Sequence, residues 1–204
     1  MHRQEHWNAV YDSRHEQQVS WFEELPALSL RMMDSAGLTP ETCVIDVGGG
    51  CSRLVDQLVA RKLTCLAILD VSGSALRHAK ARLGNAASIP IWIEGDVTAD
   101  WSVKPMDIWH DRAVFHFLTH PEDRACYRSR LLATLKPGGT AIVATFALHG
   151  PAKCSGLPVQ RYSAETLSAE FSPDLQLIES VTHVHRTPSG GAQDFVYCRL
   201  RRVI

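Results

Sequence analysis

The sequence lacks the long apolar segment that a membrane-spanning protein needs. No apolar run in its 204 residues approaches the roughly 20 residues that cross a bilayer, and no apolar signal segment follows Met1. An excess of charge of one sign is also missing, because 21 Lys and Arg residues accompany 22 Asp and Glu residues without a basic tail or stripe. We therefore expect a cytoplasmic protein that binds neither a membrane nor a nucleic acid backbone.

Cysteine pairs with the spacing of metal ligands are missing too. Six cysteines are present, and none forms a C-x-x-C pair. Cys43 and Cys65 lie in apolar, strand-like runs, where a reduced thiol behaves as a small hydrophobic side chain, so we expect no disulfide framework. His183 and His185 alternate along a late strand, but no third ligand has suitable spacing, and we expect no metal site.

Strand-like and helix-like patterns alternate along the chain. Two helical stretches occupy residues 1–40, and strands and helices then follow one another from residue 41. The expected strands are 43–47, 66–69, 89–93, 107–109, 140–146, 175–184 and 194–200, and the helices between them include 72–83, 124–135 and 163–171. This order predicts an α/β fold in a single domain, 1–204, with helices on both faces of a mostly parallel sheet and a closing antiparallel hairpin.

A glycine turn follows the first of these strands. The run Asp46-Val47-Gly48-Gly49-Gly50 lets the backbone turn tightly and lets a ligand approach closely. Asp70 ends the second strand, where a carboxylate can accept hydrogen bonds from both hydroxyls of a ribose. Because ligands of such sheets bind beyond the carboxyl ends of the strands, these residues predict a nucleoside site.

Two details favour S-adenosylmethionine over a nicotinamide dinucleotide. The nicotinamide fingerprint needs a third glycine, and Arg53 stands at that position. Asp46 precedes the glycines, and its negative charge suits the cationic amino group and sulfonium of adenosylmethionine. After the third strand, Asp96 can accept a hydrogen bond from the adenine amino group. A structural turn without a ligand is the alternative interpretation.

These motifs resemble those of the class I S-adenosylmethionine-dependent methyltransferases, with 46–50, Asp70 and 95–97 as the three motifs. The resemblance covers residues 43–146. It implies a Rossmann-like sheet of seven strands with one reversed strand, and S-adenosylmethionine as the cofactor, with S-adenosylhomocysteine as its product. It also implies cofactor contacts from Val71 and Val97 and a cofactor-covering segment at 1–40. Ser52 stands where the first motif usually has another glycine.

Shorter runs resemble individual branches of the family. Residues 107–113, 123–127 and 156–158 resemble the thiopurine methyltransferase branch, which methylates small thiols. The aromatic N-terminal segment resembles the cofactor-covering segment of small methyltransferases, some of which modify protein lysines.

The aromatic rings and a late loop are candidates for contacts with the ligands. We expect Tyr11 near the cofactor carboxylate, and Trp21 and Phe22 near the methyl acceptor. The alternative is that these rings anchor the N-terminal helix in the core. His149 and Cys154 follow the fifth strand on the ligand side, where they could line the acceptor pocket; a loop cysteine without chemistry is the alternative for Cys154.

Candidate catalytic residues follow the fourth strand, in the run that begins at His110. Asp111 could relay a proton and contact the cofactor, Arg112 could stabilise an anionic acceptor, and His116 could act as a base. A sulfonium is already a good leaving group, so a base helps without being required. The alternatives are a structural ion pair between Asp111 and Arg112, and His110 and His116 as structural residues.

The chain leaves little room for an added recognition module. We therefore expect a methyltransferase for a small-molecule nucleophile, with a thiol or related soft atom favoured, in a monomer or a dimer. A protein lysine methyltransferase and a non-catalytic adenosylmethionine-binding regulator are the rival interpretations.

Overall fold

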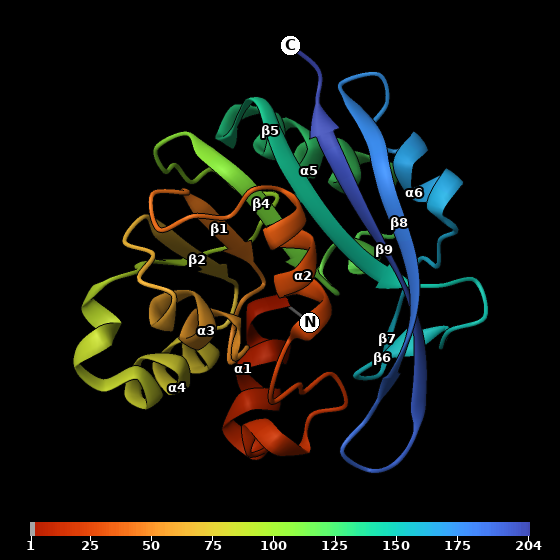
Figure 1. Ribbon diagram of the computed structural model, residues 1–204. Coiled ribbons are helices and arrows are strands. Elements are labelled where there is room, and N and C mark those ends of the chain that lie inside the picture. Colours follow the sequence, from red (N-terminus) through yellow and green to blue (C-terminus); the bar gives the residue numbers. More distant parts are fainter. Residues whose placement is uncertain (1–2) are drawn as a thin grey trace.

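One mixed sheet of seven strands organises the computed structural model, which describes residues 3–204 (Figure 1). Its strands are β1 (Val44–Val47), β2 (Leu66–Asp70), β3 (Ile91–Glu94), β4 (Met106–Arg112), β5 (Leu135–Phe146), β8 (Leu175–Arg186) and β9 (Ala192–Arg202). Their order is β3-β2-β1-β4-β5-β9-β8, and β9 runs antiparallel to both of its neighbours. The predicted α/β fold with a closing antiparallel hairpin is confirmed. Met1 and His2, which begin the predicted N-terminal segment, lie outside the described residues.

Helices cover both faces of the sheet. One face carries α2 (Ala27–Ser35), α3 (Leu54–Ala60) and α4 (Gly73–Leu83), and the other carries α5 (Pro121–Thr134) and α6 (Ala164–Ala169). The remaining elements are α1 (Arg3–Ser13), the short hairpin β6 (Lys153–Cys154) and β7 (Leu157–Pro158), and the 3-10 turns η1 (Glu16–Gln18), η2 (Gly84–Ser88) and η3 (Phe115–Phe117). In Figure 1, α1 lies beneath the end of the sheet toward which the parallel strands point.

The alternation of side chains along each strand divides the core into two layers. On β1, Val44 packs in the layer with α2 and α3, whereas Ile45 and Val47 pack in the layer with α5 and α6. All four residues of β1 are buried, as expected for a central parallel strand covered on both faces. The sheet edge at which the parallel strands end is therefore held rigidly from both sides.

The fourth strand is longer than the sequence pattern predicts. It runs to Arg112 rather than ending at residue 109, and β5 begins at Leu135 directly after α5. The register between β4 and β5 shifts after Met106, which accommodates the glycines at 138–139 within β5 instead of before it. The extra length of β4 decides which way the residues after 109 point.

A disulfide joins Cys43 and Cys65, which corrects the expectation that the chain has none. The next residues, Val44 and Leu66, are direct partners on adjacent parallel strands, so the two cysteines lie side by side with their Cα atoms 4.6 Å apart. That distance is within the range that a disulfide spans.

Among residues 3–204, no helix has the length and apolarity needed to cross a membrane.

Candidate functional site

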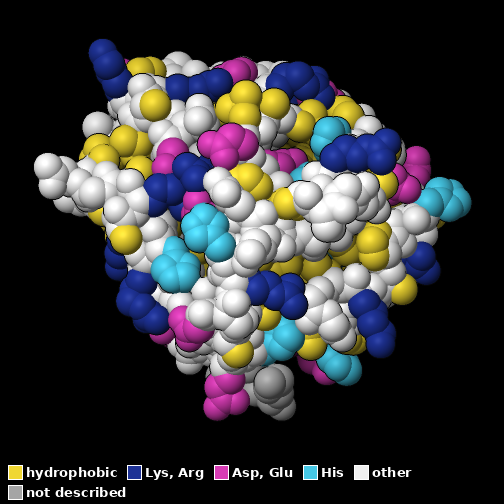
Figure 2. Space-filling view, turned by 90° about the horizontal axis from the view of Figure 1, so that it is seen from below, with side chains coloured by type: hydrophobic (Ala, Val, Ile, Leu, Met, Phe, Trp, Pro, Cys, Tyr) yellow, Lys and Arg dark blue, Asp and Glu magenta, His cyan; other side chains and the backbone are white. Residues whose placement is uncertain are grey.

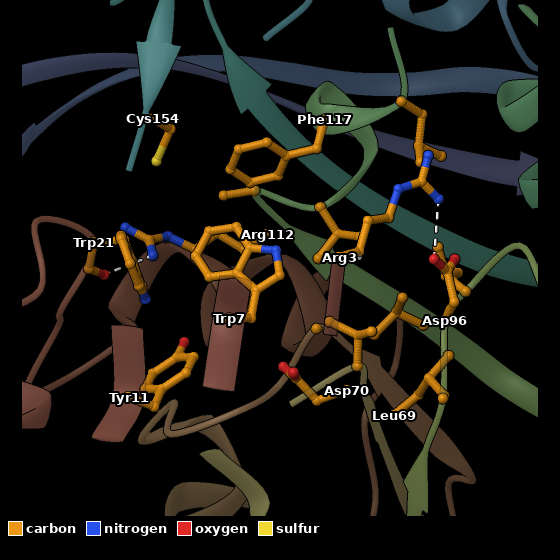
Figure 3. Close-up of a pocket in the computed structure, with 18 residues that line it drawn as sticks. Arg3, Trp7, Tyr11, Trp21, Leu69, Asp70, Asp96, Arg112, Phe117 and Cys154 are labelled. Carbon is orange, nitrogen blue, oxygen red and sulfur yellow. Dashed lines mark hydrogen bonds and ion pairs between the residues drawn. The ribbon is translucent and has the colours of Figure 1, made fainter. Parts of the chain in front are cut away.

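A cavity opens where β1, β2 and β3 end, between these strands and α1 (Figure 3). We name it the first cavity. It holds about 780 Å³ of space that no atom fills, part of which is open to solvent. Figure 2 looks onto this face of the molecule, where acidic and basic side chains are interspersed and hydrophobic side chains show between them. The position agrees with the ligand site predicted beyond the strand ends.

Asp70 forms the floor of the first cavity at the end of β2. It is only 7% exposed, and its Oδ1 atom accepts a hydrogen bond from the Ser72 backbone N–H at 2.8 Å. Burial raises the pKa of this carboxyl group to about 7, and the hydrogen bond from Ser72 opposes that rise. Val71 and Val97 line the cavity beside it. A carboxylate flanked by apolar side chains suits a ribose with an adjoining base.

Asp96 lines the same cavity after the end of β3, with Arg3 as an ion-pair partner 3.0 Å away. Its other oxygen accepts hydrogen bonds from the backbone and hydroxyl of Thr98. Burial alone would raise the pKa of Asp96, but the bonds from Thr98 and Arg3 outweigh it and lower the pKa. Arg3 also contacts Asp123 on α5, so it ties the start of α1 to this end of the cavity.

The helix α1 presents one stripe of side chains to the first cavity. Arg3, Trp7 and Tyr11 recur every four residues and therefore share one helical face, and all three line the cavity. The neighbouring stripe docks α1 onto α4, because Asn8 accepts hydrogen bonds from Ser72 and Ser74. This arrangement makes α1 the roof of the cavity, and the predicted covering of a cofactor by residues 1–40 stays a prediction. Arg3 was missed in the sequence, although its spacing from Trp7 and Tyr11 could have revealed it.

A second, smaller cavity adjoins the first. Tyr11, Trp21, Gly48 and Arg112 line both cavities, so they stand at the boundary. The second cavity is further lined by Phe22, Glu23, Ser29, Asp46, Gly49 and His110. Trp21 thus lines both cavities and Phe22 only the second, and their predicted place near the methyl acceptor stays a prediction. Glu23 and Ser29 carried no motif that could have identified them.

Arg112 is anchored from three directions. Its Nε atom donates to the Tyr197 hydroxyl at 2.9 Å, its Nη1 atom donates to the Trp21 carbonyl at 2.8 Å, and its Nη2 atom lies 3.1 Å from Glu23 Oε1. The guanidinium carbon also lies 5.0 Å from the centre of the Phe195 ring. The alternative interpretation, an ion pair between Arg112 and Asp111, is wrong, because the two side chains leave β4 on opposite faces.

Asp111 points into the layer of α5 and lines neither cavity. Its carboxylate accepts hydrogen bonds from the backbone N–H groups of Val114 and Phe115 and from the Tyr127 hydroxyl. The prediction that it contacts cofactor or relays a proton is therefore corrected. That prediction assumed that the strand had ended at residue 109, whereas the alternation of β4 continues to Arg112.

We expect Asp111→Ala to destabilise the fold by about 2–4 kcal/mol, because two backbone N–H groups and a buried hydroxyl lose their hydrogen-bond acceptor. Denaturant unfolding monitored by tryptophan fluorescence measures this loss. Ligand affinity measured on the folded fraction should stay near that of the parent. A folded variant that is as stable as the parent but has impaired turnover would instead indicate that Asp111 takes part in methyl transfer.

Two other predicted site residues lie away from the cavities. His116 is fully buried between Phe117 and Phe146, and its Nδ1 atom accepts a hydrogen bond from the Phe146 backbone N–H at 3.2 Å. Burial, together with the charge of Arg112, lowers its pKa to about 3, so its predicted role as a base is corrected. His149 is exposed and lines neither cavity, so its predicted place in the acceptor pocket is corrected too.

Cys154 does line the first cavity, from the short hairpin beyond β5 (Figure 3). Its side chain is buried, and burial raises the pKa of the thiol to about 12, although the charge of Arg112 opposes the rise. The thiol is therefore protonated near neutral pH and offers a soft, apolar contact.

No group of three or more His, Cys, Asp or Glu within residues 3–204 is arranged to hold a metal ion.

The backbone of the glycine turn lies close to Val114, Asp70 and Tyr11. Gly48 has a φ angle of +69°, a conformation that favours glycine, and a Cβ atom there would lie 2.0 Å from Val114 Cγ2. A Cβ atom on Gly50 would lie 2.8 Å from Asp70 Oδ2 and 3.2 Å from the Tyr11 hydroxyl. The sequence located the turn correctly, but the neighbour that excludes a side chain at Gly48 is Val114.

No family model matches the sequence, and no curated protein matches it either. Solved structures do match. A methyltransferase dependent on S-adenosylmethionine from Anabaena variabilis has a TM-score of 0.77 at 14% identity, covering 99% of this chain and 96% of that one. The 1,6-didemethyltoxoflavin N1-methyltransferase of Burkholderia thailandensis, with its substrate and S-adenosylhomocysteine bound, has a TM-score of 0.70 at 18% identity, covering 100% and 92%.

This chain has the fold of S-adenosylmethionine-dependent methyltransferases. A further structure with a TM-score of 0.78 at 19% identity, covering 98% of this chain and 93% of that one, concerns the conversion of a disulfide bond into a thioacetal group during echinomycin biosynthesis. The likeness therefore extends to the whole sheet and to α1. The thiopurine branch that the shorter sequence runs resemble is not among these structures.

Proposed function

We propose that the protein is an S-adenosylmethionine-dependent methyltransferase that acts on a small-molecule acceptor. One observation carries the proposal: Asp46, Asp70 and Asp96 lie at or just beyond the ends of three adjacent strands and line two adjoining cavities, with Gly48 at their boundary. Asp46 and Asp70 are buried carboxylates whose cost a ligand donor would offset, whereas Asp96 already pairs with Arg3 and Thr98. A nucleoside with a cationic tail offers a partner to each.

In this proposal the nucleoside occupies the first cavity. The Asp70 carboxylate would accept hydrogen bonds from the ribose hydroxyls, and Asp96 would accept one from the adenine amino group. The apolar side chains of Val71 and Val97 would contact the adenine ring. The amino-acid end would pass Gly48 and Gly50 toward Asp46 in the second cavity, close to the Tyr11 hydroxyl.

The bound cofactor supplies a methyl group on a sulfonium, which an acceptor lone pair displaces to leave S-adenosylhomocysteine. The chain needs to align the two partners and keep water out. Trp7 and Trp21, whose ring centres lie 5.7 Å apart, and Phe117, 5.1 Å from Trp7, form an apolar wall around the space that the acceptor would fill. No base is identified, in keeping with a leaving group that does not require one.

Closure favours a small nucleophile over a protein lysine. The first cavity is roofed by α1, which restricts the entry of a protein segment. The Cys154 thiol lines the same cavity and provides a soft contact for a sulfur acceptor. Similar folds are described both for N-methylation and for chemistry at a disulfide, so the fold accommodates either acceptor atom.

The test is incubation with methyl-labelled S-adenosylmethionine and a lysate of the source cells, followed by separation of protein, small molecules and headspace gas. Label in small or volatile products is expected, and a panel of thiols would then identify the acceptor. Label on a protein band would instead favour the lysine methyltransferase. Cofactor binding without any transfer of label would favour a non-catalytic regulator.

A further inference from the structure

A chain of three buried polar side chains lies behind the glycine turn. Asp46 on β1 and His110 on β4 are direct partners in the sheet register, so their side chains leave the same face side by side. His110 Nδ1 lies 2.7 Å from Asp46 Oδ1, and His110 Nε2 lies 2.9 Å from the hydroxyl oxygen of Ser29 on α2. Asp46 and His110 are each 3% exposed and Ser29 is 1% exposed, yet all three line the second cavity.

The hydrogen bonds fix the orientation of the Asp46 carboxylate. A carboxylate only accepts, so the proton of the pair lies on His110 Nδ1 and is donated to Oδ1. His110 Nε2 lies within hydrogen-bond distance of the Ser29 hydroxyl, so both ring nitrogens have a partner and the imidazole is held in place. Asp46 cannot rotate without breaking a buried, charge-assisted hydrogen bond.

The second oxygen of the Asp46 carboxylate is unpaired. Asp46 Oδ2 is buried and has no hydrogen-bond partner among residues 3–204. Gly49 leaves space beside this oxygen, because a Cβ atom at that position would lie 2.7 Å from it. A buried carboxylate with one unsatisfied oxygen is costly, and a cationic donor entering the cavity would offset that cost.

The cations that already line the second cavity do not serve Asp46. Arg53 Nη2 lies 2.5 Å from Glu16 Oε1, and Arg112 pairs with Glu23. Each arginine therefore already has a glutamate partner, and Glu16 also pairs with Arg82. Among residues 3–204, no lysine or arginine forms an ion pair with Asp46, so its second oxygen is left for a ligand.

We propose that His110 is a positioning residue for the cofactor, which holds Asp46 so that its free oxygen receives the ammonium group of the cofactor's amino-acid portion. The inference rests on the proposed function and assigns His110 a role at that same site. His110 acts through Asp46 and touches neither the sulfonium nor the acceptor in this scheme. Its removal should therefore affect only ligands that carry the amino-acid portion.

Two ligands separate this role from a general packing role. S-adenosylhomocysteine carries the amino-acid portion, and 5′-methylthioadenosine has the same nucleoside and sulfur without it. Calorimetric titration of His110→Phe should show S-adenosylhomocysteine binding weakened roughly tenfold, the scale of a lost charge-assisted hydrogen bond, with 5′-methylthioadenosine binding unchanged. His110→Asn, whose amide can donate from nearly the Nδ1 position, should restore part of the affinity.

A double-mutant cycle with Asp46→Asn completes the test. If His110 acts through Asp46, His110→Phe should add little to the loss that Asp46→Asn causes alone. Equal weakening of both ligands by His110→Phe or His110→Asn would overturn the proposal, as would unchanged binding of both. Should His110→Phe fail to fold, His110→Asn and Asp46→Asn carry the same comparison. If the unaltered protein binds neither ligand, it is the proposed function that fails.

Discussion

Replacement of Asp70 with Asn should cost most of the affinity for S-adenosylmethionine and, at pH 8, should make the ligand-free protein more stable. Affinity falls because the amide offers one acceptor where the carboxylate offers two, and it carries no charge. A loss of roughly 10- to 100-fold is expected for the missing charge-assisted hydrogen bonds. Stability rises because Asp70 is 7% exposed and an ionised carboxylate is poorly solvated there.

The direction of the pH dependence follows from the pKa of Asp70. Burial raises this pKa from 3.8 to about 7, so the folded protein holds the proton more tightly than the unfolded chain does. The stabilisation from that proton is complete below pH 4 and is lost as the pH rises through 7. The difference between the two pKa values corresponds to about 4 kcal/mol at pH 8, which the Asn variant should regain in part.

Cofactor affinity should follow pH in the opposite direction. Binding through the ribose hydroxyls requires the ionised carboxylate, so the affinity of the unaltered protein should rise as the pH increases through about 7. Thermal unfolding and calorimetric titration at pH 6 and pH 8 measure both effects. Asp100→Asn, whose side chain is 93% exposed, is a matched control and should change neither quantity. A destabilised Asp70→Asn protein at pH 8 would contradict the argument.

The strand-end carboxylates were predictable because their signal is local. An Asp at or near the end of a short apolar run indicates the end of a buried strand. Asp70 is the last residue of its strand, Asp46 stands one residue before the end of its strand, and Asp96 follows its strand by two residues. The parallel sheet then brings the ends together without further information. The glycine turn at 48–50 is equally local, since only a few residues and their backbone angles define it.

The errors concern properties that depend on neighbours distant in the sequence. The apolar pattern ends near residue 109, but pairing with β1 and β5 extends β4 to Arg112 and turns Asp111 away from the site. The disulfide between Cys43 and Cys65 follows from the register of β1 and β2, which composition does not reveal. The link between His110 and Ser29 likewise depends on where α2 packs.

The buried carboxylates also explain why the site needs a rigid frame. Asp70 is stabilised in part by the Ser72 backbone, Asp46 is held by His110, and Asp111 fastens the turn that carries Val114. Each contact fixes a group that would otherwise move to reduce the cost of an unpaired charge. The fold therefore gathers buried negative charge where the parallel strands end, and a cationic nucleoside would balance it there.

Gly48→Ala should destabilise the protein by about 2–4 kcal/mol and remove most cofactor binding. The alanine Cβ atom would lie 2.0 Å from Val114 Cγ2, and the backbone at +69° disfavours any side chain. Val114 cannot easily withdraw, because its backbone N–H is held by Asp111 Oδ1 at 2.9 Å. Denaturant unfolding and titration with S-adenosylhomocysteine measure the two losses.

Two further variants separate the clash from the backbone strain. Gly190→Ala has a similar φ angle of +86° and no atom within 4 Å of the new Cβ atom, so it should cost only about 1 kcal/mol. Gly48→Ala combined with Val114→Ala removes the clashing methyl group and should recover stability to nearly the level of Gly190→Ala. If Gly48→Ala alone were no worse than Gly190→Ala, Val114 would have moved freely, and the turn would be less rigid than its contacts with Asp111 require.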